Sequence, residues 1–239
     1  MNFVGHIKVA LDQLDARSRN DDGDGGPMDG GEDPEALVVG AALPDIAAIG
    51  RFRLSGTSSD NAVRAGVALH HRTDDAFHSH RWFRQHNGSV AAALADIGVR
   101  RGAARAVGHV GVELLLDGYL LATDPNLGRR AEAALATVTA PGRDLVSLVD
   151  PDRRPDWSTH LDRTARWPVP ADYRDPAAVA GRLQRILAHR PRLSFGTEQV
   201  AAVADVLAEA RAGLEAGADD LVADLAELVR TNPDHLDGR

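Results

Sequence analysis

The sequence predicts an all-α fold, with one helical domain rather than several. Apolar residues recur at spacings of three and four along most of the chain, which is the period of an amphipathic helix. No segment alternates apolar and polar residues as a half-buried strand does. Hydrophobic residues make up 44% of the 239 positions, which is ordinary for a globular protein with a core. We therefore expect a helical bundle in a single domain.

The N-terminal half divides into five predicted helices and one insertion. Residues 17–34 are rich in glycine and aspartate and cannot bury a core, so they predict a disordered acidic, glycine-rich insertion. Pro44 interrupts the second helix, because the residue before a proline is driven away from helical geometry. Ser59 or Asp60 can cap the third helix, and an Asn-Gly pair at 87–88 can end it. The expected helices cover residues 2–15, 35–49, 61–86, 89–97 and 103–123.

The C-terminal half predicts four more helices. A stretch that carries prolines and tryptophans, residues 151–176, separates the first of them from the others. The last nine residues, 231–239, are polar and should fray. The expected helices cover residues 127–139, 175–189, 197–215 and 217–231.

Composition excludes several classes of protein. The chain has no cysteine, which rules out disulfides and thiolate metal sites, so any metal must be held by His, Asp and Glu. The net charge of −8 argues against general nucleic-acid binding, which needs a basic surface. Neither a signal peptide nor a run of ~20 apolar residues is evident. We expect a cytoplasmic protein without a membrane segment.

The predicted helix over 61–86 contains the run ALHHRTDDAFHSH, which concentrates histidines and carboxylates. His70, Asp74 and His78 are spaced by four, so they lie along one face, and His71, Asp75 and His78 form a second such set. Imidazole and carboxylate groups one turn apart can hold a single cation. The alternative is a solvated helix face with incidental His–Asp pairs.

The predicted helix over 103–123 is apolar nearly all round, which indicates a buried element. Its polar exceptions, His109, Glu113 and Asp117, are four apart and form one stripe. Unpaired carboxylates are costly to bury, so such a stripe favours contact with a metal, a cationic partner or a wet cleft. One or two buried salt bridges to arginines are the alternative.

Several further residues are weaker candidates. His6 and Asp45, each taken alone, are more typical of a helix cap or a satisfied core residue than of a ligand. Arg72, Arg190 and Arg192 are suited to clamp phosphate oxygens, because a guanidinium presents two parallel donors. A bound cation in such a setting would lower the pKa of a water molecule while a carboxylate accepts its proton. We find no P-loop, no nucleophile elbow and no dinucleotide-binding glycine motif.

Five motifs, in order from residue 1 to about residue 195, resemble one known family. They are MNFVGH with His6, GAALPDIAAIG with Asp45, AGVALHHRTDDAFHSH with His70, Arg72, Asp74 and His80, VELLLDGYLL with Glu113 and Asp117, and RPRL at 190–193. The chain thereby resembles the bacterial acyl carrier protein phosphodiesterases, or acyl carrier protein hydrolases, which are divergent relatives of the HD-domain metal phosphohydrolases. It departs from them in the insertion at 17–34 and at three positions: His78 replaces an aspartate, Glu113 an aspartate and Gly118 a histidine.

The resemblance implies an HD-like helical core over residues 1–195, with the C-terminal helices of residues 196–239 packed on it. It implies a divalent cation, Mn²⁺ first and Mg²⁺, Fe²⁺ or Zn²⁺ otherwise, and release of 4′-phosphopantetheine from holo acyl carrier protein, which would be the partner. The implied metal ligands are Asp45, His70, Asp74, Asp117, His6 and His109. The implied catalytic residues are Asp74, Glu113 and Arg72, and the implied substrate contacts are Arg190, Arg192 and His80.

The departures keep two other functions open. One is a metal-dependent phosphohydrolase that acts on a nucleotide or a small phosphoester. The other is a helical binding or regulatory protein whose catalytic set has decayed. Acyl carrier proteins are acidic, so binding one would need a local basic surface on this acidic chain. Two groups of arginines are candidates for it: Arg100, Arg101 and Arg105, or Arg182, Arg185, Arg190 and Arg192. The sequence does not indicate an oligomeric state.

Overall fold

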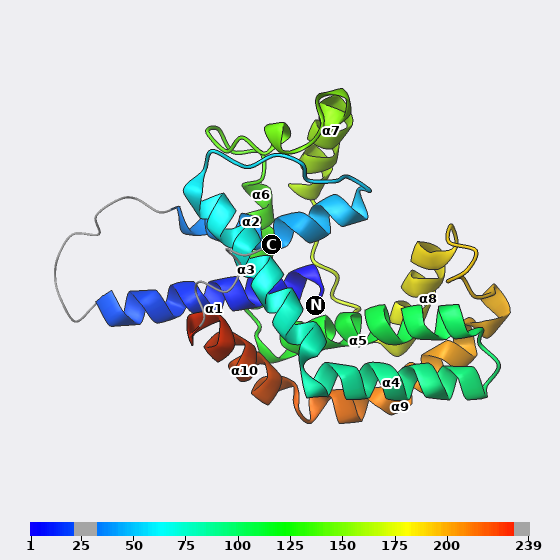
Figure 1. The fold of residues 1–239 in the computed structure, drawn as a ribbon. Coiled ribbons are helices and arrows are strands. Elements are labelled where there is room, and N and C mark those ends of the chain that lie inside the picture. The colour runs from blue at the N-terminus through cyan, green and yellow to red at the C-terminus, as the bar shows by residue number, and fades with distance from the viewer. Residues whose placement is uncertain (22–32, 232–239) are drawn as a thin grey trace. The chain divides into compact units, whose positions relative to one another are not determined.

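The computed structural model describes residues 1–21 and 33–231, and it is drawn in Figure 1. Within these ranges it contains ten α-helices, three short 3-10 helices and no strand, and 75% of the structure is helical. The predicted all-α, single-domain fold class is confirmed. Contacts group the residues into two compact units, each assembled from three separate stretches of the chain. Unit 1 comprises Met1–Asn2, Asp75–Pro125 and Pro170–Leu225, and unit 2 comprises Phe3–Asp74, Asn126–Val169 and Ala226–Arg239.

Unit 2 is organised around the first helices of the chain. Its elements are α1 (Phe3–Asp21), α2 (Pro34–Ile49), residues 61–74 of α3 (Asn61–Ser79), α6 (Leu127–Ala136), η1 (Val146–Leu148), η2 (Pro151–Arg153) and α7 (Arg154–Thr164). Helix α1 packs along α2, and α6 contacts both. The side chain of Asp33 caps α2 by accepting hydrogen bonds from the backbone N–H groups of Glu35 and Ala36.

Two glycines let α2 and α3 approach closely within unit 2. A Cβ atom on Gly66 would lie 2.2 Å from the Leu37 carbonyl oxygen and 2.8 Å from the Cα of Gly40. A Cβ atom on Gly40 would lie 2.3 Å from the Val63 carbonyl oxygen. All three distances are far below van der Waals contact, and the atoms met are backbone atoms, which cannot rotate away. The absence of side chains at these two positions therefore sets the separation of the helices.

Unit 1 is built from the long central helices. Its elements are the last residues of α3, then α4 (Arg81–Asp96), α5 (Arg101–Thr123), α8 (Pro176–Leu187), η3 (Thr197–Gln199), α9 (Val200–Glu215) and α10 (Ala218–Thr231) as far as Leu225. Helices α4 and α5 lie side by side, and α9 packs against both of them and against α8 (Figure 1). By length and composition alone α5 could cross a membrane, but 61% of its most apolar window is buried, as is typical of a core helix.

Gly118 on α5 is fixed by a close approach within unit 1. A Cβ atom there would lie 2.3 Å from the backbone nitrogen of Arg174 and 2.4 Å from the carbonyl carbon of Tyr173. Any side chain at this position would collide with that backbone. Glycine at position 118 is therefore required by how this chain packs.

The expected helix over 61–86 is wrong, because the chain breaks at His80 instead of at residues 87–88. His80 has extended backbone angles, and its Nδ1 accepts a hydrogen bond from the Trp82 backbone N–H at 3.2 Å, which caps α4. The Asn-Gly pair lies inside α4, so the separate helix expected over 89–97 is also wrong. Sequence reasoning missed this boundary because histidine is not among the preferred capping residues.

Three other expectations need correction. Pro44 does not interrupt α2, because burial of apolar residues on both sides of it outweighs the one backbone hydrogen bond that proline removes. Helix α1 continues to Asp21, so residues 17–21 are helical rather than part of the insertion; residues 22–32 lie outside the described residues, as do residues 232–239 of the expected frayed end. The stretch 151–176 contains η2 and α7. The buried face of α7 includes the polar residues His160 and Thr164, so the helical spacing of apolar residues is not evident in its sequence.

Candidate metal centre

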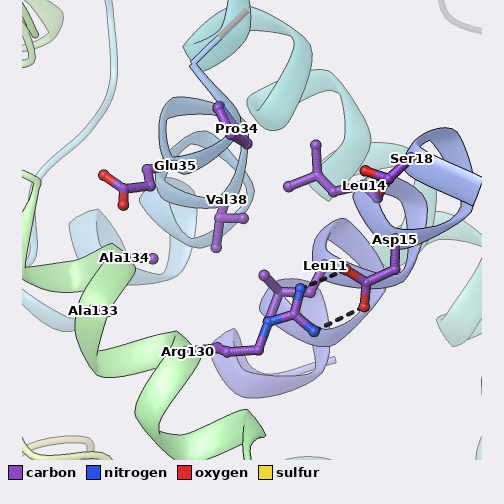
Figure 2. A pocket seen from close by; sticks show the side chains of 10 residues that line it. All are labelled: Leu11, Leu14, Asp15, Ser18, Pro34, Glu35, Val38, Arg130, Ala133 and Ala134. Atoms are coloured by element: carbon purple, nitrogen blue, oxygen red, sulfur yellow. Dashed lines mark hydrogen bonds and ion pairs between the residues drawn. The ribbon is translucent and has the colours of Figure 1, made fainter. Parts of the chain in front are cut away.

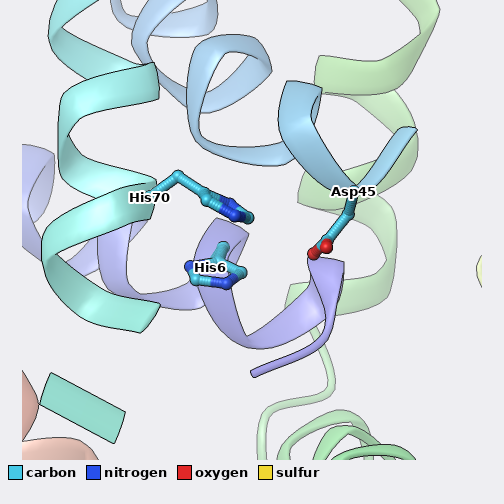
Figure 3. Close-up of side chains that lie close together, drawn as sticks. All are labelled: His6, Asp45 and His70. Atoms are coloured by element: carbon cyan, nitrogen blue, oxygen red, sulfur yellow. The ribbon is translucent and has the colours of Figure 1, made fainter. Parts of the chain in front are cut away.

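Three helices of unit 2 each contribute one side chain to a cluster of potential metal ligands. His6 comes from α1, Asp45 from α2 and His70 from α3, and Figure 3 shows the two imidazoles and the carboxylate turned toward one another. One ligand atom from each residue lies within 4.8 Å of the other two. Both imidazoles are buried, with 1% of His6 and 6% of His70 exposed. We call these three residues the candidate metal centre.

The orientation of His70 is fixed by a backbone carbonyl. Its Nδ1 lies 2.8 Å from the carbonyl oxygen of Ala41 on α2, and a carbonyl only accepts, so Nδ1 carries the proton. The lone pair therefore resides on Nε2. Burial, together with the nearby His6 ring, lowers the pKa of His70 from 6.5 to about 3. The imidazole is thus neutral at ordinary pH, as a metal ligand must be.

The orientation of His6 is fixed by a buried threonine. Its Nδ1 lies 2.8 Å from the Thr73 hydroxyl oxygen. That hydroxyl is 2.9 Å from the carbonyl oxygens of both Leu69 and His70, and it donates its single proton to one of them. The oxygen must then accept from Nδ1 of His6, which leaves the lone pair on Nε2. The rings of His6 and His70 stack with centroids 3.8 Å apart.

The close crossing of α2 and α3 positions these groups. Gly66 and His70 are one helical turn apart on α3, and Gly40 directly precedes Ala41 on α2. The contact between the two glycines therefore brings the Ala41 carbonyl within hydrogen-bonding distance of the His70 ring. The same helix α2 carries Asp45 one turn after Ala41.

The donor set of the candidate metal centre fits a divalent cation. Two imidazole nitrogens and one carboxylate oxygen are ligands that zinc, manganese and iron accept, and remaining positions would be filled by water. Around an ion with bonds of about 2.1 Å, neighbouring ligand atoms lie ~3.3 Å apart, so modest side-chain shifts bring the three together. Hydrogen bonds from both Nδ1 atoms to oxygen acceptors are the usual second layer around metal-bound histidines.

The predicted residue Asp74 lies beside the candidate metal centre. Its Oδ1 is 3.7 Å from Nε2 of His6, and its side chain is 33% exposed. Arg72, on the same helix, is half-buried. Asp74 is therefore near enough to exchange a proton with a group at the centre, while its exposure gives it access to solvent.

The remaining predicted residues belong to unit 1, so the six predicted metal ligands are divided between the units. Asp117 is fully buried on α5, and Glu113 is 8% exposed beside the half-exposed His109. Burial alone would raise the pKa of Glu113, but hydrogen bonds from His109 and His78 and the charge on the Met1 nitrogen outweigh it and hold the pKa below its ordinary range.

The three predicted substrate contacts also lie in unit 1. His80 caps α4, and its Nε2 lies 3.4 Å from Asp224. Arg190 and Arg192 are exposed in the turn between α8 and η3. Sequence reasoning missed Thr73 and the Ala41 carbonyl as groups that orient the ligands, because their contacts with His6 and His70 join residues 67 and 29 positions apart.

Unit 2 also contains a pocket of about 330 Å³ between α1, α2 and α6. Figure 2 shows the Arg130 guanidinium on one wall facing the carboxylate of Asp15, with two hydrogen bonds of 2.7 and 2.8 Å. The other lining residues are Leu11, Leu14, Ser18, Pro34, Glu35, Val38, Ala133 and Ala134. No residue of the candidate metal centre lines this pocket, so the reactive groups and the pocket are separate features.

Replacing Thr73 by valine should weaken cation binding by about 10- to 100-fold, because Nδ1 of His6 would lose the acceptor that orients the ring. Affinity would be measured by competition between the protein and a chelating dye. Thr164→Val is the matched control, since Thr164 is equally buried and bonds a carbonyl one turn back on α7. Equal affinities in the two variants would contradict the orienting role of Thr73.

A comparison of the chain with protein-family models, with curated proteins and with solved structures finds no match. The fold and the candidate metal centre therefore define the class of protein by themselves. The class is an all-α protein with clustered histidine and carboxylate groups suited to a divalent cation.

Proposed function

We propose that this chain is a metal-dependent phosphodiesterase that releases 4′-phosphopantetheine from holo acyl carrier protein. The observation that carries the proposal is the candidate metal centre, in which one ligand atom each of His6, Asp45 and His70 lies within 4.8 Å of the other two, while both Nδ1 atoms are held by oxygen acceptors. These three residues come from three different helices, and each falls on a motif through which the sequence resembles acyl carrier protein hydrolases.

Each residue at the centre has its own role in the proposed hydrolysis. His6, Asp45 and His70 hold the cation, which we propose to be Mn²⁺, and when bound it supplies Lewis-acid chemistry that acidifies water and neutralises phosphoryl charge. Asp74 accepts the proton of the attacking water, because its carboxylate lies next to the ligands and reaches solvent. Arg72 follows His70 by two residues, and we assign its guanidinium to the phosphoryl oxygens.

A basic surface in unit 1 supports an acidic protein as the partner. The guanidinium of Arg100, at the start of α5, donates to the carbonyl oxygens of Pro191 at 2.8 Å and Ser194 at 3.0 Å. These two hydrogen bonds join two groups of arginines that are far apart in the sequence. Their exposed members are Arg100, Arg101, Arg105, Arg185, Arg190 and Arg192. An acidic carrier protein would be attracted here despite the net charge of −8.

The proposal is tested with holo acyl carrier protein and the chelator-stripped, metal-reloaded protein. Mass spectrometry of the carrier protein should show loss of phosphopantetheine with Mn²⁺, none after chelation, and recovery on reloading. Arg101→Glu should slow this release several-fold at low salt and leave hydrolysis of a small phosphodiester unchanged.

Other outcomes would replace the proposal. Turnover of nucleotides or small phosphoesters without release from the carrier protein would favour the phosphohydrolase alternative. No turnover of either substrate class by metal-loaded protein would favour a binding or regulatory protein.

A further inference from the structure

A second cluster of potential metal ligands lies wholly within unit 1. His78 stands at the end of α3, and His109 and Glu113 lie one turn apart on α5. Nε2 of His78 and Nε2 of His109 are each 3.1 Å from Oε1 of Glu113, and all three ligand atoms lie within 4.8 Å of one another. We infer that His78, His109 and Glu113 form a second divalent-cation site, suited to a borderline cation such as Zn²⁺.

The positions of the two imidazoles are fixed before any ion binds. Their rings stack with centroids 4.8 Å apart and planes 20° apart. Both rings also meet Phe83, which is 3% exposed: its ring lies 4.9 Å from that of His78 and 5.1 Å from that of His109, edge to face in both pairs. This apolar support restricts both histidines to orientations in which Nε2 points at Glu113.

The exposure of the three side chains gives an ion a route to the site. The side chain of Glu113 is only 11% exposed, whereas those of His78 and His109 are 30% and 43% exposed. A cation would therefore reach the buried carboxylate between the two half-exposed rings. The arrangement combines a buried negative charge with an accessible pair of nitrogen donors.

The alternative role of this cluster is to neutralise Glu113 without a metal. Without an ion, both histidines direct Nε2 at one oxygen of Glu113, and the Met1 nitrogen lies 3.4 Å from the same oxygen. Binding a cation would require each Nε2 proton to move to Nδ1 or to solvent, which frees the Nε2 lone pair to act as a ligand. Neighbouring ligands around a tetrahedral ion are ~3.3 Å apart, close to the 3.1 Å observed, so the exchange needs little movement.

The inference is tested by counting Zn²⁺ equivalents on the chelator-stripped full chain, using calorimetric titration and elemental mass spectrometry after dialysis. His109→Asn and His78→Asn should each bind one equivalent fewer than the unmodified protein. His189→Asn is the control, because His189 is exposed in unit 1 outside the cluster, and it should keep the full count. Helical circular dichroism checks that each variant is folded; if His78→Asn unfolds, the more exposed His109 variant decides.

The result separates this site from the candidate metal centre. An equivalent that is lost in His109→Asn but kept in Asp45→Asn supports the second site, whether or not the protein hydrolyses any phosphodiester. An unchanged count and affinity in folded His109→Asn would overturn it and leave the cluster as a buried carboxylate neutralised by two histidines.

Discussion

Replacing Asp45 by asparagine should weaken binding of a divalent cation at the candidate metal centre by at least about a hundredfold. Loss of a group that only orients a ligand costs 10- to 100-fold in affinity, and Asp45 supplies the only negative charge among the three ligands, so its loss should cost at least as much. Release of phosphopantetheine at limiting Mn²⁺ should fall in the same proportion if the proposed function is correct. Asparagine keeps the volume and one oxygen, so the change isolates the charge.

Metal content by elemental mass spectrometry and the rate of release would be measured on the same preparations. Asp162→Asn is the matched control, since Asp162 is exposed on α7 in the same unit and lies outside the cluster. It should retain both metal and rate. A folded Asp45→Asn protein that kept full metal occupancy at limiting Mn²⁺ would show that the cation is held by other residues.

The fold class and the ligand-bearing helices could be predicted because their signals are local. The three- and four-residue spacing of apolar side chains identifies most helices, and the stripe of His109, Glu113 and Asp117 indicates buried carboxylates by its spacing alone. The structure confirms that Glu113 and Asp117 are buried. Local spacing could not show that His78, from another helix, completes the cluster around Glu113, because that contact joins residues 35 positions apart.

The failures of prediction have local physical causes. His80 ends α3 and caps α4 through a ring nitrogen, a role that sequence rules give to serine, threonine, aspartate or asparagine. Helix α7 was missed because its buried face includes His160, whose Nε2 bonds the Ile46 carbonyl at 2.9 Å, and Thr164, which bonds the His160 carbonyl. Each of these two polar side chains has a hydrogen-bond partner inside the core, so its polarity does not indicate that it is exposed.

The candidate metal centre, too, could be predicted only in part from local sequence patterns. His70 was singled out by its place among histidines and aspartates, whereas His6 and Asp45 gained weight only through the family resemblance. Asp45 and His70 are brought together where α2 and α3 cross at Gly40 and Gly66, and sequence periodicity does not reveal this crossing. The positions of these ligands depend on Gly40 and Gly66, which have no functional side chain. Substituting one of these glycines tests this dependence.

Gly66→Ala should lower the free energy of unfolding by about 2–3 kcal/mol, and the melting temperature by roughly 5–10 °C. The new Cβ would lie 2.2 Å from the Leu37 carbonyl oxygen and 2.7 Å from the Ala41 nitrogen, so α2 and α3 must separate by about an ångström. That separation would lengthen the 2.8 Å hydrogen bond from His70 to Ala41, and cation affinity should fall together with stability.

Gly88→Ala is the same chemical change as Gly66→Ala, but we expect it to have the opposite effect on the free energy of unfolding. Gly88 lies within α4, and a Cβ atom there would meet nothing within 4 Å. Alanine should therefore raise the free energy of unfolding by about 0.5–1 kcal/mol, because it restricts the unfolded chain and favours the helix. Thermal unfolding followed by circular dichroism, with cation titration of both variants, would separate the two effects. If Gly66→Ala matched Gly88→Ala in stability and in cation affinity, the crossing of α2 and α3 would not be what holds the ligands in place.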